Sequence, residues 1–483
     1  MAARSTMSST PQSVTLADKI VYASPGLVLA AVGVPLYIYI PKFYTDTVGV
    51  SAAAMGGLIL AARLVDAASD PLIGVLSDRS RTRFGRRRPY IGLGSLALAG
   101  LLVALYTPPQ AASGIATLWF GAAILLVSLA WTVVDVPWES LGPEITFSYD
   151  ERTSLFSFRE GMTIAGTILA AAAPLLIEQA LSLSKSPADQ RTKFMVFGLA
   201  FAPLILICCW LCVWRIRERS VSPGSLSGTR GEPFWRSWRD IFSNRPFLIL
   251  VLSYAVAAVG ANLPATLILY YVEYVLGGTQ AEIFILLYVL AGIVFLPVWL
   301  KVSDRLDKKW AWIAAMGINS GAFLGVFSLG RGDLTAYGVL TVLSGLGFGA
   351  TLALPPAMQA DVIDYDELLH GRRREGHFIG VWSVVKKGSS AIGLGLALPL
   401  LDFFGYQPGQ AQSEQVRFVL RVLYCLLPCC CYFGAIGIAL AYPLSRSRHE
   451  ALLAGIALRR QGAPAPDPLR PGVILQPYQP LRK

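Results

Sequence analysis

Residues 62–88 read ARLVDAASDPLIGVLSDRSRTRFGRRR and join the end of an apolar run to a block of basic residues. The run covers residues 51–77, which exceeds the roughly 20 residues that an α-helix needs to cross a bilayer. The basic block, Arg79 to Arg88, is typical of loops that remain on the cytoplasmic side of a membrane. The stretch therefore predicts a membrane-spanning helix that ends at the cytoplasm.

The rest of the sequence repeats this arrangement. Its 483 residues are 54% hydrophobic and only 15% charged, whereas soluble proteins average about 25% charged residues. Apolar runs cover residues 20–44, 51–77, 89–107, 114–138, 154–181, 194–215, 247–275, 280–302, 310–329, 334–357, 377–402 and 416–443. We therefore expect an all-α membrane protein of twelve transmembrane helices, with the lipid bilayer as its solvent.

The net charge of +11 is distributed over the loops between these runs. Basic loops fall on one side of the membrane under this count, at Arg79 to Arg88, Arg215 to Arg245, Lys301 to Lys309 and Arg372 to Arg374. The positive-inside rule makes that side cytoplasmic, and no cleavable signal peptide is visible in residues 1–18. We expect both termini in the cytoplasm, a multi-pass protein of the cell inner membrane, and no nucleic-acid partner.

A short internal repeat indicates two similar halves. Leu76 to Arg79 (LSDR) follows the second run and Val302 to Arg305 (VSDR) follows the eighth, so each ends the second helix of its half. The predicted division is a cytosolic tail at 1–19, a six-helix half at 20–215, a cytosolic linker at 216–246, a second six-helix half at 247–445 and a cytosolic tail at 446–483. The last of these is rich in proline, and we expect it to be partly disordered.

Charged residues inside the second run indicate a functional site. Arg63, Asp66 and Asp70 lie in the apolar segment, and the two aspartates are one helical turn apart. A charge in hydrocarbon costs at least about 2.5–3.5 kcal/mol, so these side chains must face a cavity, a counter-charge or an ion. A structural salt bridge is the alternative, but Arg63 can be the counter-charge of only one aspartate. The second carboxylate therefore favours an ion or proton site.

The fourth run carries a similar set of oxygen atoms. Thr132, Asp135 and Glu139 are spaced by three and four residues and share one face of a helix. Oxygen donors from two adjacent helices can replace the water around Na⁺, whereas proton coupling needs only one titrating carboxylate. The residue types leave Na⁺ and H⁺ both open as the coupling ion. No other metal and no cofactor are expected.

Two further basic residues lie within apolar runs. Arg159 sits early in the fifth run beside Glu160, and Lys386 and Lys387 sit in the eleventh. Adjacent residues point about 100° apart on a helix, so only one of the two lysines can point inward. That lysine can neutralise the aspartates when the cation site is empty, which would couple ion occupancy to conformation.

The loop after the second run has the composition of a conformational latch. Gly74 permits close approach of helices, Asp78 can accept a hydrogen bond from a helix end or an arginine, and Arg79, Gly85 and Arg86 can hold the cytoplasmic ends of neighbouring helices. A merely topogenic basic loop is the alternative.

These features resemble the major facilitator superfamily, and within it the glycoside-pentoside-hexuronide:cation symporters, which are melibiose permease-like. The motifs that carry the resemblance are Gly74-x-Leu76-x-Asp78-Arg79 with Gly85-Arg86-Arg87, Phe43 to Asp46, Asp66-Ala67 with Asp70-Pro71, Arg83 to Pro89, Asp135 to Pro137, Glu151-Arg152 followed by Arg159, and Ala360 to Tyr365. The resemblance implies a cation site at Asp66, Asp70, Thr132 and Asp135, a sugar-binding role for Arg159, and a match of Lys387 to the lysine of the eleventh helix.

Two positions depart from the family pattern and bear on the solute. Ala30 stands where a sugar-binding aspartate is expected in the first helix, and Glu139 stands where a tryptophan is expected. Residues 27–32 form an apolar wall that would suit an amphiphile, although a lipid-facing helix shows the same pattern.

Three functions follow from these observations. The first is a secondary active transporter that moves a glycoside or related small solute together with Na⁺ or H⁺ by alternating access. The second keeps the fold and makes the cargo a lysolipid or other amphiphile, and the third is a non-transport membrane assembly factor. No enzyme is expected, because no embedded histidine, metal-ligand spacing or nucleophile with a nearby base occurs. The expected partners are the solute and the cation, with the protein a monomer.

Overall fold

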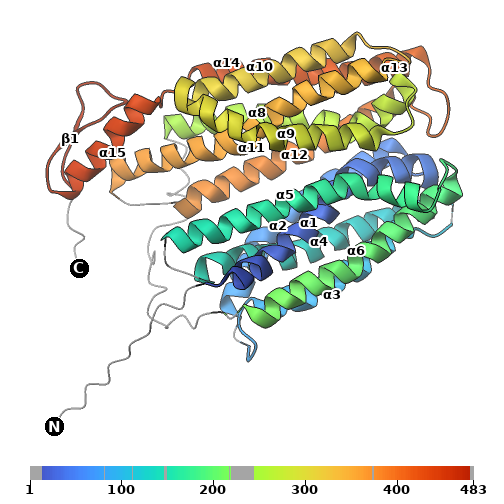
Figure 1. Ribbon diagram of the computed structural model, residues 1–483, viewed down its shortest axis with the longest axis horizontal. Helices are drawn as coiled ribbons and strands as arrows, with labels where there is room; N and C mark the ends of the chain where they lie inside the picture. The colour runs from blue at the N-terminus through green and yellow to red at the C-terminus, as the bar shows by residue number, and fades with distance from the viewer. Residues whose placement is uncertain are drawn as a thin grey trace. The chain divides into compact units, whose positions relative to one another are not determined.

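The computed structural model describes residues 14–80, 82–110, 112–145, 149–216, 218, 244–371 and 375–478. These residues form long helices, with two short strands near the C-terminus (Figure 1). The chain divides into two compact units, Met1–Leu36 with Ala68–Ser225 and Tyr37–Ala67 with Leu226–Lys483. The division passes through the first two helices, so each unit is described separately below.

The first unit contains most of the early helices of the chain. They are α1 (Leu16–Lys42), α2 (Ala52–Arg79), α3 (Arg88–Tyr106), α4 (Ser113–Ile145), α5 (Tyr149–Ala180) and α6 (Pro187–Arg215), with the end of α1 and the start of α2 assigned to the other unit. Within the unit α3 packs against both α4 and α6.

The second unit contains the remaining helices. They are α8 (Arg245–Tyr270), α9 (Ala281–Leu306), α10 (Lys308–Phe327), α11 (Leu334–His370), α12 (Glu375–Phe403), α13 (Glu414–Arg421), α14 (Leu427–Leu440) and α15 (Arg446–Arg460), with π-helical segments η1 (Phe43–Val48), η2 (Tyr271–Leu276) and η3 (Val422–Leu426). In this unit α11 packs on α9 and α10, and α8 packs on α12 and α14.

Each of the twelve predicted apolar runs forms a helix among the described residues. Eleven of the helices in this part of the chain are long and apolar enough to cross a membrane. The run not among them is α2, which has 28 residues and holds Arg63, Asp66 and Asp70. Its length still exceeds the roughly 20 residues needed for a span. The all-α membrane fold predicted from the sequence is confirmed.

Several helices begin where the side chains favour it. The Ser186 side chain accepts a hydrogen bond from the Asp189 amide, and a proline occupies the first turn of α6. Asn244 does the same for α8 by accepting from the Phe247 amide at 3.2 Å. Such caps satisfy amides that a helix leaves without partners, and proline loses nothing at these positions.

The two first helices of the predicted halves end alike. α1 continues into η1 and stops at Gly49, and α8 continues into η2 and stops at Gly277, both glycines having left-handed backbone. The LSDR and VSDR motifs likewise lie in the last turns of α2 and α9. The repeat noticed in the sequence thus extends to local structure.

The C-terminal segment corrects the prediction of partial disorder. Residues 446–460 form α15, and β1 (Ala465–Pro466) pairs antiparallel with β2 (Ile474–Leu475). Prolines suggested disorder, but Pro466 lies in β1 itself, and Leu452 and Ala465 are fully buried. The predicted linker at 216–246 lies outside the described residues, except for Ile216, Glu218 and residues 244–246.

Candidate functional site

The first part of the charged segment of α2 belongs to the second unit. Arg63 lies 3.6 Å from the Asp66 carboxylate, and its guanidinium stacks on the ring of Tyr37 at 3.7 Å. Asp66 is only 6% exposed. The ion pair and the cation–π contact offset part of the cost of holding these charges among apolar helices. The salt bridge considered from the sequence therefore forms with Asp66.

The second aspartate of α2 belongs to the first unit and contacts α4. The Thr132 hydroxyl donates to the Asp70 carboxylate at 3.1 Å, and the Ser69 hydroxyl lies 3.4 Å from that of Thr132. Ser69 and Thr132 are buried. Two residues predicted as cation ligands, Asp70 and Thr132, are thus in direct contact. Sequence reasoning missed Ser69, although a hydroxyl residue next to Asp70 was a visible signal.

The other predicted residues of α4 lie on the same helical face as Thr132. Asp135 is half-buried and Glu139 is exposed, so the carboxylate that replaces the expected tryptophan is accessible. The adjacent Trp138 donates its indole N–H to the Tyr22 carbonyl at 2.8 Å. This bond fixes α4 against α1 and sets which way Asp135 and Glu139 can face.

Arg159 lies on α5 in the first unit. It forms an ion pair with Glu160 at 2.7 Å and lies over the Phe156 ring at 5.0 Å. About two turns further along α5, a Cβ on Gly166 would collide with the backbone of Leu27, so α5 lies directly against α1. The predicted solute residue Arg159 is therefore carried on a helix whose distance from α1 depends on a glycine.

The two adjacent lysines of α12 belong to the second unit and differ in exposure. Lys386 is exposed and Lys387 is half-buried, as expected if only one of them points inward. The Ser390 hydroxyl donates to Asn262 at 3.1 Å, and Tyr254 stacks with Trp382 at 4.3 Å, which joins α12 to α8. Because Lys387 and the pair of Asp70 and Thr132 lie in different units, their approach stays a prediction.

The apolar wall of α1 lies inside the protein. Val28, Ala31 and Val32 are fully buried and Leu29 is 3% exposed. Ala30 is half-buried among them. A lipid-facing helix does not account for this burial, so the wall contributes to packing within the protein.

The loop predicted to act as a latch turns at Gly85, which has a φ of 112°. The carboxylate of Glu218 accepts hydrogen bonds from the amides of Arg86, Arg87 and Arg88 at 2.6, 2.8 and 2.7 Å. A carboxylate at this point satisfies the free amides at the start of α3 and opposes the positive end of its dipole. Sequence reasoning missed Glu218, whose signal was an acidic residue between Arg217 and Arg219.

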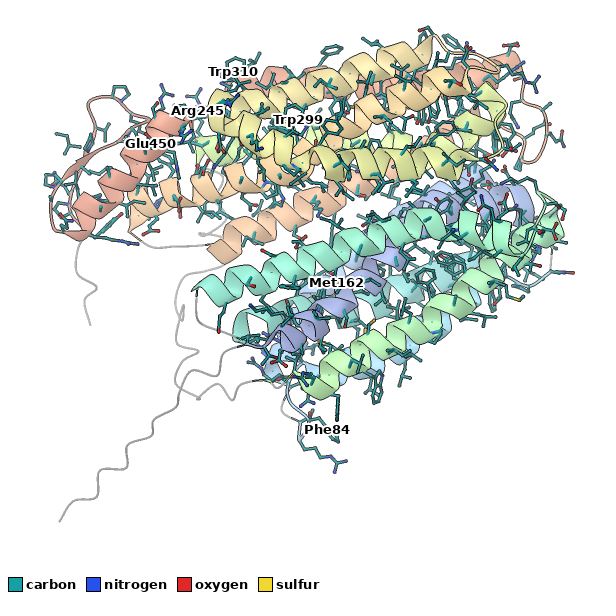
Figure 2. The ribbon with its side chains drawn as sticks, in the orientation of Figure 1. Phe84, Met162, Arg245, Trp299, Trp310 and Glu450 are labelled. Carbon is teal, nitrogen blue, oxygen red and sulfur yellow. The ribbon has the colours of Figure 1, made fainter. Side chains whose placement is uncertain are left out.

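Two arginines of the same loop fasten other helices. Arg87 donates to the carbonyl of Ser140 on α4, and Arg88 donates to that of Val213 on α6 at 2.6 Å. Among the predicted latch residues, a Cβ added to Gly74 would lie 3.7 Å from the Val136 side chain. Arg79 is exposed, and the Asp78 side chain lies outside what the structure describes. The tip of the loop is the exposed Phe84 (Figure 2).

A second polar cluster, which sequence reasoning missed, lies at the end of α1 in the second unit. Lys42 contacts the Asp46 carboxylate at 2.6 Å and Glu273 of η2 at 2.9 Å. Tyr274 and Tyr406 donate to Asp46 at 2.7 and 2.5 Å. Burial, with the neighbouring phenols and Asp46, raises the pKa of Tyr406 far above its ordinary value, so its hydroxyl remains a donor. The only sequence signal was the Phe43 to Asp46 motif.

Comparisons with known proteins identify the family of the chain. The model of the family "MFS/sugar transport protein" matches residues 21–446. The chain belongs to this family. It is similar to an uncharacterized symporter of Synechocystis, with 27% identity over 88% of this chain and 94% of the relative, and to the isoprimeverose transporter of Lactiplantibacillus pentosus, with 28% identity over 84% and 83%.

Solved structures place the chain in the major facilitator fold. The nucleoside transporter NupG aligns with a TM-score of 0.65 and 10% identity, over 87% of this chain and 99% of that one. A bacterial homolog of the lysosomal transporter Spinster aligns with a TM-score of 0.62 and 16% identity, over 89% and 98%. The protein is thus a multi-pass membrane transporter and not an enzyme, as predicted.

Proposed function

We propose that this member of the MFS/sugar transport family moves a glycoside or related small solute in symport with Na⁺ or H⁺. The observation that carries the proposal is the hydrogen bond from Thr132 to Asp70, which joins a carboxylate of α2 to a hydroxyl of α4 inside the apolar part of the protein. Oxygen atoms gathered there suit a small hard cation or a proton. Asp66 and Asp135 would complete the site in the bound state.

The solute would interact with Arg159, and Lys387 would respond to cation occupancy. Both are charged residues of apolar helices with partial burial. Arg63 would adjust the charge at Asp66 through their ion pair. Glu139 would take part in solute binding or coupling at the position where the resembled sugar carriers have a tryptophan. The names of the relatives, which include an isoprimeverose transporter and a glucuronide carrier homolog, favour a sugar over the lysolipid and assembly-factor alternatives.

The proposal also covers the membrane location, the cofactor, the oligomeric state and the domain division of the protein. The protein acts in the inner membrane with both termini in the cytoplasm, as the basic loops suggest. No cofactor beyond the coupling ion is required, and one chain suffices for alternating access. The proposed division is two six-helix halves joined by residues 216–246.

The test is uptake by reconstituted protein over a panel of glycosides and lysolipids, with and without a Na⁺ gradient at fixed pH. Asp70→Asn should abolish cation-stimulated uptake, because it removes the charge that Thr132 orients. The control is Glu414→Gln, whose carboxylate is exposed and contacts only Arg417 among the described residues. Full cation stimulation in the Asp70 variant would refute the cation site, and uptake of lysolipid alone would refute the sugar.

A further inference from the structure

The C-terminal segment Arg446 to Tyr478, here called the clasp, begins where the family match ends. The family model covers residues 21–446, and α15 starts at Arg446. Figure 1 shows α15 and β1 beyond the end of α11, and α15 packs against that helix. The clasp is therefore an addition to the shared fold that has its own contacts with it.

The helix that the clasp contacts is longer than a membrane span requires. α11 has 37 residues, which corresponds to about 55 Å of helix, whereas the hydrocarbon core is roughly 30 Å thick. Its last turns, Asp361 to His370, therefore extend beyond the core. A projecting helix end is well placed to be held or released from outside the membrane.

The clasp binds the carbonyl end of α11. Arg459 donates to the carbonyls of Leu368 and Leu369, and its guanidinium lies over the Tyr478 ring at 4.1 Å. Tyr478 donates to the Glu367 carbonyl at 3.0 Å, and Arg460 pairs with the Glu367 carboxylate. Carbonyls at a helix end have no partners within the helix, so these donors cap α11 from another segment.

Apolar burial supports the same contact. Leu452 is fully buried and Ile456 is 6% exposed on the face of α15 that meets α11. A Cβ on Gly455 would lie 3.1 Å from the Leu368 side chain, so the two helices approach closely. The Tyr365 hydroxyl donates to Asp467 at 3.2 Å, which ties the turn after β1 to α11.

One titratable residue of the clasp faces a cluster of charges. Nε2 of His449 lies 3.1 Å from the Asp364 carboxylate and 3.5 Å from that of Asp361, both on α11. Lys308 of α10 contacts Asp361 at 2.7 Å on the same cluster. On α15 itself, Glu450, which is labelled in Figure 2, pairs with Arg446 at 3.4 Å. A protonated His449 thus meets two carboxylates and one ammonium group.

We propose that the clasp is a proton-operated restraint, which holds the projecting end of α11 more tightly when His449 is protonated and less tightly when His449 loses its proton. Asp361 and Asp364 belong to the Ala360 to Tyr365 motif through which the chain resembles its family. Holding this end slows any conformational change that moves α11 relative to α10. Under the proposed topology the sensed compartment is the cytoplasm.

The sign of the effect follows from the histidine. The hydrogen bond to Asp364, opposed by burial and helped by Asp361, raises the pKa of His449 above its ordinary value of about 6.5. A raised pKa in the docked state means that docking gains stability below the ordinary pKa and loses that gain as pH rises through the raised value. The clasp therefore holds most tightly below about pH 6.5 and loosens as the pH rises above that value.

Hydrogen exchange on the full chain tests the docking itself. After correction for intrinsic exchange, peptides covering 361–371 and 446–460 should lose protection about tenfold for each unit by which docking raises the pKa of His449, between about pH 6 and pH 9. His449→Gln should remove this pH step. The control is His370→Gln, because His370 pairs with Asp366 on α11 itself at 3.1 Å and should leave the step intact.

Transport supplies the second readout. In proteoliposomes, raising the pH on the clasp side should speed uptake, and both His449→Gln and a chain ending at Ser445 should lose this dependence. A pH step in exchange that survives in His449→Gln, or the same uptake response in the variant as in the wild type, overturns the proposal. Exchange can be measured without any solute, so a failed proposal for symport leaves this test valid.

Discussion

The loop after α2 and the loop after α9 occupy equivalent places in the repeat and fasten the same kinds of helices with different chemistry. After α2, Arg87 binds the Ser140 carbonyl on α4 and Arg88 binds the Val213 carbonyl on α6. After α9, Lys308 binds the carboxylate of Asp361 on α11, and Lys309 donates to the carbonyls of Leu440 and Tyr442 at 2.6 and 3.0 Å.

The two loops also differ in the carboxylate contacts that hold the loops themselves in place. Glu218 accepts from three consecutive amides after Gly85. In the second loop the carboxylate belongs to the loop and the amide lies outside it: Asp307 accepts from the Arg446 amide at 3.0 Å. The arginines of the first loop bind neutral carbonyls and the Glu218 carboxylate holds the loop, whereas Lys308 of the second loop binds the Asp361 carboxylate, which also meets His449. Only the second contains a group that titrates near neutral pH.

The largest expected effect is the removal of the carboxylate at the first loop. Glu218→Ala should lower the free energy of unfolding of the first unit by about 2–4 kcal/mol, because three amides lose a charged acceptor. Thermal unfolding in detergent measures it. Glu218→Gln, which keeps an acceptor without the charge, should lose less than half as much. Equal losses in the two variants would show that the contact is steric.

A smaller effect is expected at Gly85, where two costs combine. Gly85→Ala should cost about 1–3 kcal/mol, since alanine is strained at this positive φ and its Cβ would lie 2.7 Å from the Glu218 carboxylate. Gly49→Ala is a matched control, with a φ of 92° and nothing within 4 Å of the added Cβ. The difference in melting temperature between the two variants isolates the clash, and identical losses would leave strain as the whole cause.

The sequence predicted the elements of these regions better than their partners. Apolar runs and basic loops located the twelve predicted membrane helices, because the bilayer requires them, but not α15. Gly85 was also identified from the sequence as part of the loop after α2. Glu218 and His449 could not be assigned, since each acts on residues more than eighty positions away and nothing local indicates that contact. The clasp was misjudged because proline content suggested disorder, while the burial that stabilises it comes from α11.

For the intramembrane charges, too, the sequence predicted the residues but not their partners. Spacing placed Asp66 and Asp70 one turn apart, but it could not decide which one Arg63 would take. The answer depends on the Tyr37 ring beside Arg63 and on the Thr132 hydroxyl beside Asp70, which come from other helices. Residue types therefore indicated the site, and packing between helices determined its pairing.

The salt dependence of the free energy of unfolding should distinguish the two loops, because their partners differ in charge. Lys308→Met should lower the free energy of unfolding of the second unit by about 0.5–1 kcal/mol at low ionic strength, because Lys308 is a partly exposed partner of Asp361. The loss should shrink as salt screens the ion pair. Arg88→Met breaks a bond to the neutral carbonyl of Val213, so its cost should vary less with salt. Unfolding at about 0.02 M and about 1 M salt measures both, and an equal salt response would contradict the distinction.

The smallest effect is expected at Asp307, where two contributions oppose each other. Asp307 has a φ of 84°, which glycine adopts without strain, so Asp307→Gly gains about 1 kcal/mol in backbone energy. The same change removes the acceptor for the Arg446 amide, at a cost of about 0.5–1.5 kcal/mol. Thermal unfolding should therefore change by less than about 1 kcal/mol. Asp307→Ala keeps the strain and loses the acceptor, so it should be clearly less stable than Asp307→Gly, and the reverse order would show that the acceptor contributes nothing to the second loop.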